Sequence, residues 1–110
     1  MLSAQFLVFS NPAEGREDEY NRWYDQVHLG EVKAVPGVEA ARRYRVKPLG
    51  DGAPRHRYLA VYDLSGDDPA ATLGRILARA QGGGFRMSDA LDPHVETLLV
   101  EALPPVDGAS

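Results

Sequence analysis

Cysteine is absent from this 110-residue chain, which excludes disulfides, zinc–thiolate sites and cysteine nucleophiles. No apolar run approaches the length of a membrane span. Residues 1–5 also lack the charged start and the apolar core of a signal peptide. We therefore expect a cytoplasmic protein that has no membrane partner.

Positive charge is scarce, because 12 Lys and Arg residues stand against 16 Asp and Glu residues and give a formal net charge of -4. A nucleic-acid partner is not expected, since a phosphate backbone attracts a dense positive field. The basic run 42–47 is an exception, but strand alternation would divide its charges between two faces. We interpret that run as structural or as part of a substrate site.

Motifs for metals and cofactors are missing as well. No pair of histidines stands at ligand spacing with a carboxylate. The triple glycine 82–84 lacks the lysine and the strand-to-helix setting of a phosphate-binding loop, and no serine stands in a nucleophile elbow. The sequence therefore predicts neither a metal nor a cofactor.

The chain does contain enough apolar residues, 44% of the total, for one hydrophobic core. We expect a single domain over residues 1–103. The tail over 104–110 begins with two prolines and is expected to be disordered or to contact a partner subunit.

Periodicity predicts the elements of the first half. Residues 2–10 form a short, mostly apolar strand. Acidic residues between 14 and 19 mark a helix N-terminus, and apolar residues at helical spacing extend that helix to about Val35. Pro36 ends the helix, and alternating residues predict a strand over 38–46.

The second half begins with a turn over 49–54, which joins this strand to another over 58–64 as a hairpin. Asp67 or Asp68 caps a second helix, whose apolar side is followed by the triple glycine 82–84. These elements complete a strand-helix-strand-strand-helix order.

The connection over 81–93 is long for so small a domain, and such loops are often functional, for example as a lid. A last strand over 94–101 follows. The order β-α-β-β-α-β predicts a ferredoxin-like α+β fold with a four-stranded antiparallel sheet and both helices on one face. Apolar residues occur on both alternation sets of the strands, so the sheet face without helices would expose apolar side chains to water. We therefore expect a homodimer formed through this open sheet face.

The first helix carries the most informative pattern. Residues four apart share a helix face, so Tyr20, Tyr24 and His28 form a ladder of polar-tipped rings. His28 is the leading catalytic candidate, because an imidazole can take up and return a proton near neutral pH. Alternatively it is a structural histidine that bonds to a neighbour such as Glu31, which could equally raise its basicity or be solvated.

Tyr24 is the second catalytic candidate, since its phenol can donate a hydrogen bond to a substrate carbonyl or enolate. The alternative is a packed aromatic residue whose hydroxyl is satisfied locally. Trp23 is interpreted first as a core residue, and Tyr20 is expected at the pocket mouth or on the surface.

Further candidates lie on the sheet and in the long connection. Tyr44 and Tyr62 can form mixed polar and aromatic walls, although alternation does not say which sheet face lines the pocket. Phe85 and Met87 close over a ligand or cap the core. The predicted substrate-binding set is Tyr20, Trp23, Tyr44, Tyr62, Phe85 and Met87.

A series of short motifs runs along the chain: Trp23-Tyr24-Asp25, a histidine four residues after the tyrosine, Pro36-Gly37 and an arginine-tyrosine strand. Together they resemble the dimeric α/β-barrel proteins of the EthD-like group over nearly the whole chain. The resemblance implies the ferredoxin-like fold and the homodimer. Relatives include cofactor-free polyketide cyclases, muconolactone isomerases and small quinone-forming monooxygenases, so the reaction does not follow from the fold.

Three functions therefore stay open. The first is a cofactor-independent enzyme of the lyase, isomerase or cyclase type, in which His28 performs acid–base chemistry on a small hydrophobic, oxygenated or aromatic substrate. The second is a cofactor-free monooxygenase of an electron-rich phenol, and the third is a non-catalytic dimer that binds a small ligand. We rank the first highest, because the pocket of this group commonly hosts chemistry.

Overall fold

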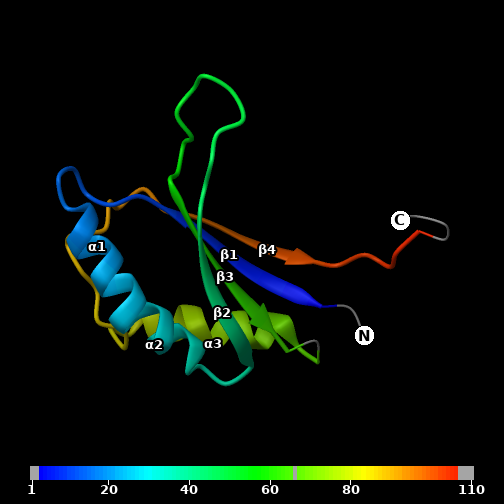
Figure 1. Cartoon of the computed structure of the whole chain (residues 1–110). Helices are drawn as coiled ribbons and strands as arrows, with labels where there is room; N and C mark the ends of the chain where they lie inside the picture. The colour runs from blue at the N-terminus through cyan, green and yellow to red at the C-terminus, as the bar shows by residue number, and fades with distance from the viewer. Residues whose placement is uncertain (1–2, 66, 107–110) are drawn as a thin grey trace.

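The computed structural model describes residues 3–65 and 67–106. Four antiparallel strands form one sheet in the order β2-β3-β1-β4, with the helices on one side of it (Figure 1). The elements in chain order are β1 (Ala4–Ser10), α1 (Glu17–Trp23), the π-helical turn η1 (Tyr24–His28), α2 (Leu29–Lys33), β2 (Val38–Arg45), β3 (Tyr58–Leu64), α3 (Pro69–Gln81) and β4 (Glu96–Glu101). Within the described residues, no helix is long and apolar enough to cross a membrane. The arrangement is the ferredoxin-like α+β fold that the sequence predicts.

Most predicted boundaries agree with the structure to within about two residues, and the 58–64 strand agrees at both ends. The first helix ends at Lys33, and the last strand begins at Glu96 rather than at residue 94. Of the predicted tail, residues 104–106 are exposed and have no regular structure, while 107–110 lie outside the described residues, as does residue 2 of the first predicted strand.

Local sequence explains how α3 begins and how the chain turns after α2. Of the two predicted caps, Asp68 is the one that accepts a hydrogen bond from the Ala71 N–H, at 3.0 Å. Gly37 has a φ of 99°, and a Cβ at this position would lie 2.1 Å from Thr72 Oγ1. The turn therefore requires a glycine where it passes α3.

Side-chain alternation divides the sheet into a covered face and an open face. On the covered face, Phe6 lies opposite Tyr62 in the pairing of β1 with β3, and both side chains are buried. The remaining buried hydrophobic residues are Ala4, Tyr20, Tyr24, Val32, Val35, Tyr58, Ala60, Leu64, Ile76, Phe85 and Ala90. Since four of the buried residues are tyrosines, this core contains hydroxyl groups that need hydrogen-bond partners.

The open face carries an apolar patch that spans three strands. Leu7 of β1 lies between Val61 of β3 and Leu98 of β4 in the strand register. Leu98 is 47% exposed and its neighbour Val100 is 38% exposed. We call Leu7, Phe9, Leu59, Val61, Leu98 and Val100 the open-face patch. A monomer in water rarely leaves a contiguous apolar surface of this kind uncovered.

Candidate functional site

One helical segment carries most of the candidate residues, and a π turn interrupts it. The N–H of Leu29 bonds to the carbonyl oxygen of Tyr24, five residues earlier rather than four. The additional residue rotates the following side chains by about 100° relative to an uninterrupted α-helix. Turns of this kind are frequent at functional sites, and η1 contains both predicted catalytic residues, Tyr24 and His28.

His28 lies among three aromatic rings. Trp23 stacks on its imidazole with 4.6 Å between ring centroids, while the edges of Tyr24 and Phe85 meet it at 5.1 and 5.7 Å. We call Trp23, Tyr24 and Phe85 the His28 cage. The Nδ1 atom of His28 is buried and has no hydrogen-bond partner. Burial lowers the pKa of the imidazole, and the nearby charge of Glu31 opposes that shift only in part, so the ring is neutral at neutral pH.

Two hydrogen bonds hold the segment after α3 against this cage. Trp23 Nε1 donates to the Arg86 carbonyl oxygen at 2.7 Å, and the Arg86 N–H donates to Glu31 Oε1 at 2.9 Å. Phe85 is buried, and its ring contacts both the imidazole of His28 and the guanidinium of Arg79, whose carbon lies 5.2 Å from its ring centroid. Glu31 thus holds the loop and acts on His28 through its charge.

Three buried tyrosines extend the site toward the sheet. Tyr20, Tyr24 and Tyr62 are at most 2% exposed. Tyr20 shares a hydrogen bond of 2.6 Å with Ser10 Oγ, so it lies in the core and not at a pocket mouth or on the surface as expected. The Tyr62 hydroxyl is buried without a partner. Burial raises the pKa of Tyr24 to about 12 and raises that of Tyr62 further, so both phenols keep their protons and can donate them in hydrogen bonds.

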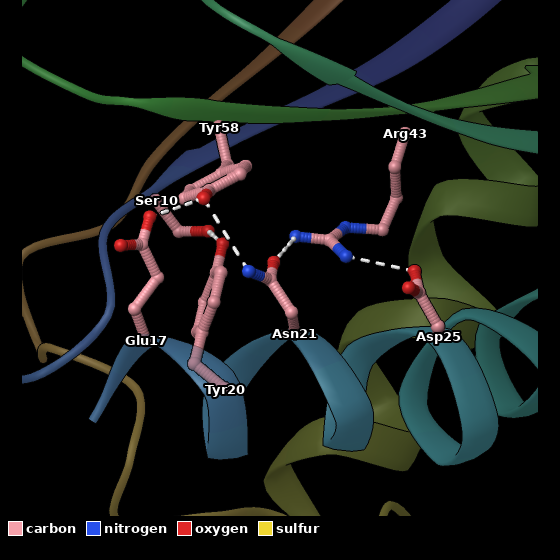
Figure 2. Close-up of polar contacts among 7 residues, drawn as sticks. All are labelled: Ser10, Glu17, Tyr20, Asn21, Asp25, Arg43 and Tyr58. Carbon is pink, nitrogen blue, oxygen red and sulfur yellow. Dashed lines mark hydrogen bonds and ion pairs between the residues drawn. The ribbon is translucent and has the colours of Figure 1, made fainter.

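A polar network on the same helix, which the sequence analysis did not predict, centres on Arg43 of β2 (Figure 2). Arg43 Nη1 donates to Asp25 Oδ1 at 2.7 Å, and Nη2 donates to Asn21 Oδ1 at 2.8 Å. The Asn21 amide donates in turn to the Tyr58 hydroxyl at 3.3 Å, and Tyr58 donates to Glu17. The network therefore connects the edge strand with both α1 and η1.

Arg43 also makes cation–π contacts. Its guanidinium carbon lies 5.3 Å from the Tyr20 ring centroid, 4.6 Å from that of Tyr24 and 5.2 Å from that of Tyr58. The sequence contains a pattern that could have predicted this network. Asn21 and Asp25 are one helical turn apart, and Arg43 belongs to the alternation set opposite to Tyr44. What the sequence could not supply was the face of β2 that meets the helix.

Two predicted substrate-binding residues lie apart from the His28 cage. Tyr44 is 46% exposed, and its register with Leu59 places it on the open face. Met87 is 61% exposed, although Phe85 two residues earlier is buried against His28. The structure therefore brings Tyr20, Trp23, Tyr24, His28, Tyr62 and Phe85 together and leaves Tyr44 and Met87 outside this group.

The surface pockets lie on several parts of the molecule, and one of them borders the polar network. Of five pockets on the described part of the chain, none is lined by His28. One of about 460 Å³ is lined by Asn21, Asp25, Arg43, Tyr44, Arg45 and Tyr58. No group of three or more His, Asp or Glu side chains within residues 3–65 and 67–106 is placed to hold a metal ion. His28 is half-buried, and its aromatic neighbours leave only part of the residue exposed to solvent.

No family model and no curated protein matches this chain, but solved structures do. The chain is similar to a putative monooxygenase from Shewanella loihica, with a TM-score of 0.63 and 10% identity over 96% of this chain and 99% of that one. It is also similar to an EthD family protein from Bacillus halodurans, with a TM-score of 0.53 and 12% identity over 94% of this chain and 100% of that one.

Two further similarities concern ligands and assembly. The haem degrader MhuD from Mycobacterium tuberculosis, solved with two haems in its active site, matches with a TM-score of 0.59 and 19% identity over 94% of this chain and 98% of that one. A dimeric ferredoxin-like protein of unknown function from a Jannaschia species matches with a TM-score of 0.54 and 16% identity over 93% and 99%. The chain thus has the fold of dimeric ferredoxin-like and EthD-like proteins, as the resemblance predicts.

Proposed function

We propose that this protein is an enzyme in which His28 transfers a proton on a small oxygenated or aromatic substrate. The observation that carries the proposal is the buried Nδ1 atom, which has no hydrogen-bond partner in an otherwise well-packed aromatic cage. An unsatisfied buried acceptor or donor costs about 1–3 kcal/mol, so such groups call for a functional explanation. A neutral imidazole is the form that accepts a proton from a substrate.

The neighbouring residues support the chemistry of proton transfer. The phenols of Tyr24 and Tyr62 stay protonated, and a hydrogen bond from either would stabilise negative charge on a substrate oxygen. Trp23 and Phe85 pack against the half-buried imidazole and reduce its contact with water, which strengthens such interactions. We infer a lyase, isomerase or cyclase reaction without a cofactor, because these steps need only a base and a stabilised oxyanion.

Substrate entry requires movement of the segment around Phe85. Its ring contacts that of His28, and the Arg86 backbone is held beside it because it accepts a hydrogen bond from Trp23 and donates one to Glu31. Gly83, with a φ of 75°, lies two residues before Phe85 and has open space around it. We propose that this segment is a lid, which hinges at the triple glycine and replaces Phe85 by substrate in the cage.

Haem does not fit this site as it stands. A haem iron would take an imidazole nitrogen as its ligand, but Trp23, Tyr24 and Phe85 surround the His28 ring and none of the five pockets described above is lined by His28. A planar macrocycle needs more space than the removal of one phenylalanine ring provides. We therefore derive no step through haem.

We propose that the active form is a homodimer built through the open-face patch. The patch is apolar and partly exposed, and the similar Jannaschia protein is described as dimeric. Tyr44, which lies on this face, is then an interface residue or a substrate contact from the interface side. The cytoplasmic location expected from the lack of cysteine stays a prediction.

The second candidate is a cofactor-free monooxygenase, which the similarity to the Shewanella loihica protein favours. In that reaction His28 would deprotonate an electron-rich phenol, and the phenolate would react with dioxygen. Both candidates need the same base, so they differ only in their requirement for oxygen.

A conversion assay tests the proposal. Wild-type protein and His28→Asn are incubated with enol lactones, β-diketones and hydroquinones, with and without oxygen, and the products are identified by mass spectrometry. We expect His28→Asn to lower conversion by about 10²-fold or more. The matched control is His94→Asn, whose side chain is 89% exposed and whose conversion should equal that of wild type.

Three results are informative here. Conversion at full rate without oxygen eliminates the monooxygenase. Equal conversion by wild type and His28→Asn removes His28 from the mechanism. Tight binding of a compound that stays chemically unchanged would favour the non-catalytic ligand-binding protein instead.

A further inference from the structure

We propose that Arg43 is a positioning residue, which fixes the π turn η1 through Asp25 and Asn21 and thereby sets the orientation of the His28 ring. The catalytic consequence of this inference rests on the proposed function. The structural role of Arg43 does not depend on the proposed function, because it concerns the geometry of His28 with or without substrate.

The contacts of Arg43 straddle the point where the α-helix becomes a π turn. Asn21 belongs to α1 and Asp25 belongs to η1, and each accepts a hydrogen bond from a different terminal nitrogen of the same guanidinium. Figure 2 shows the Arg43 side chain descending from β2 between these two residues. A planar guanidinium holds two acceptors in a fixed geometry, so it fixes Asp25 relative to Asn21.

The burial of Arg43 makes these contacts hard to replace. Its side chain is 12% exposed, and it lies against the rings of Tyr20, Tyr24 and Tyr58. A buried charge without its partners is strongly unfavourable. Asp25 is 62% exposed and would otherwise be free to rotate into water. The ion pair therefore holds the Asp25 carboxylate against the buried guanidinium.

The constraint reaches His28 over a short path. Asp25 and His28 lie in the same π turn, and Tyr24, whose ring lies 4.6 Å from the guanidinium carbon, is also a wall of the His28 cage. A π turn is rare and occurs mostly as a single turn within an α-helix, so we infer that the contacts of Arg43 help to hold it here. Release of Asp25 should let the turn relax and let water reach the buried Nδ1 side of the imidazole.

The pKa of His28, measured by NMR from the pH dependence of its ring resonances, separates positioning from a direct effect of charge. Asp25→Ala removes the acceptor and the charge, whereas Asp25→Asn removes the charge and keeps an acceptor. If the pair positions the turn, Asp25→Ala exposes the ring and raises the pKa of His28 toward its ordinary value of about 6.5. If only charge matters, both variants remove a nearby anion and lower the pKa of His28.

Two further variants serve as controls for the effect of Asp25→Ala on the pKa of His28. Asp89→Asn breaks the 2.8 Å ion pair with Arg16 near the start of the same helix, so it should leave His28 unchanged. The titratable groups nearest the cage, Tyr24, Glu31 and Arg79, are retained in every variant. Arg43→Lys keeps the positive charge but cannot hold two acceptors in the same plane, so it should shift His28 in the same direction as Asp25→Ala.

The inference is overturned if Asp25→Ala leaves the pKa of His28 unchanged or lowers it as much as Asp25→Asn does. A rise with Asp25→Ala and with Arg43→Lys, and none with Asp89→Asn, supports it. Because the resonances report on His28 without turnover, failure of the proposed function is recognised separately. In that case His28→Asn would leave conversion intact while Asp25→Ala still shifted the pKa.

Discussion

His28 meets two conflicting requirements. Its ring packs against Trp23 and Phe85 as an apolar side chain would, yet its Nδ1 atom is buried without a partner. The sequence predicted the histidine on an aromatic face, and the rings around it confirm that placement. It predicted Phe85 as a residue that closes over a ligand or caps the core, but not its contact with His28, because loop 81–93 has no periodicity from which a contact can be derived.

The lowered pKa of His28 predicts that stability falls in acid. The unfolded chain binds a proton near pH 6.5, whereas the folded protein resists protonation, so the unfolded state holds more protons as the pH falls. The free energy of unfolding should therefore fall from about pH 6.5 downward until the folded form is also protonated. His28→Phe should reduce this loss, as measured by urea denaturation between about pH 5 and 8.

The control for this measurement is His94→Phe, in which an exposed histidine is replaced in the same way. It should keep the acid loss of the wild type. An acid loss of the same size in His28→Phe would mean that the burial of His28 does not contribute to it.

At the scale of elements, alternation and helical periodicity predicted every strand and both helical segments. The π turn escaped prediction, because Tyr20, Tyr24 and His28 fit the spacing of an ordinary α-helix. The Arg43 network escaped for a different reason: a strand has two equivalent alternation sets, and only the packed structure selects the one that faces α1. Tertiary packing thus determines the π turn and the face of β2 that meets α1, which the local sequence does not specify.

Two glycines near the end of this helical segment should respond in opposite ways to alanine. Gly30 lies within α2 with open space around its Cα, so Gly30→Ala should stabilise the protein by about 0.5–1 kcal/mol through helix propensity. Gly37 has a positive φ, and a Cβ there would meet Thr72, so Gly37→Ala should cost more than about 1 kcal/mol.

Thermal denaturation of both variants measures the difference. The same substitution chemistry is used at both sites, so the opposite signs cannot arise from the change of residue type alone. A destabilising Gly30→Ala would mean that the glycine is needed for the geometry of the helix after η1.

At the scale of the whole molecule, the sheet has one face covered by helices and one that is apolar and uncovered. The sequence predicted this, since apolar residues occupy both alternation sets, and the open-face patch is consistent with that prediction. Which residues of a second copy meet the patch does not follow from one chain, because alternation defines a surface and not its orientation on a partner.

The proposed dimer predicts an effect of charge on the open face. Leu98→Asp places a carboxylate at the middle of β4, opposite Leu7, where burial without a partner costs several kcal/mol, roughly enough to dissociate a dimer at micromolar concentration. Leu77→Asp, on the outer side of α3 and 46% exposed, is the matched control and should stay dimeric. Sedimentation velocity distinguishes the two, and a monomeric wild type would contradict the dimer.

If His28 transfers a proton on a bound small molecule, the protein should catalyse hydrogen–deuterium exchange at a carbon of that molecule. Enol lactones and β-diketones are incubated with the protein in D₂O, and deuterium in the recovered compound is measured by NMR. The account predicts incorporation at a carbon next to a carbonyl with wild type, and a loss of about 10²-fold or more with His28→Asn. Exchange at equal rates with both proteins would contradict it.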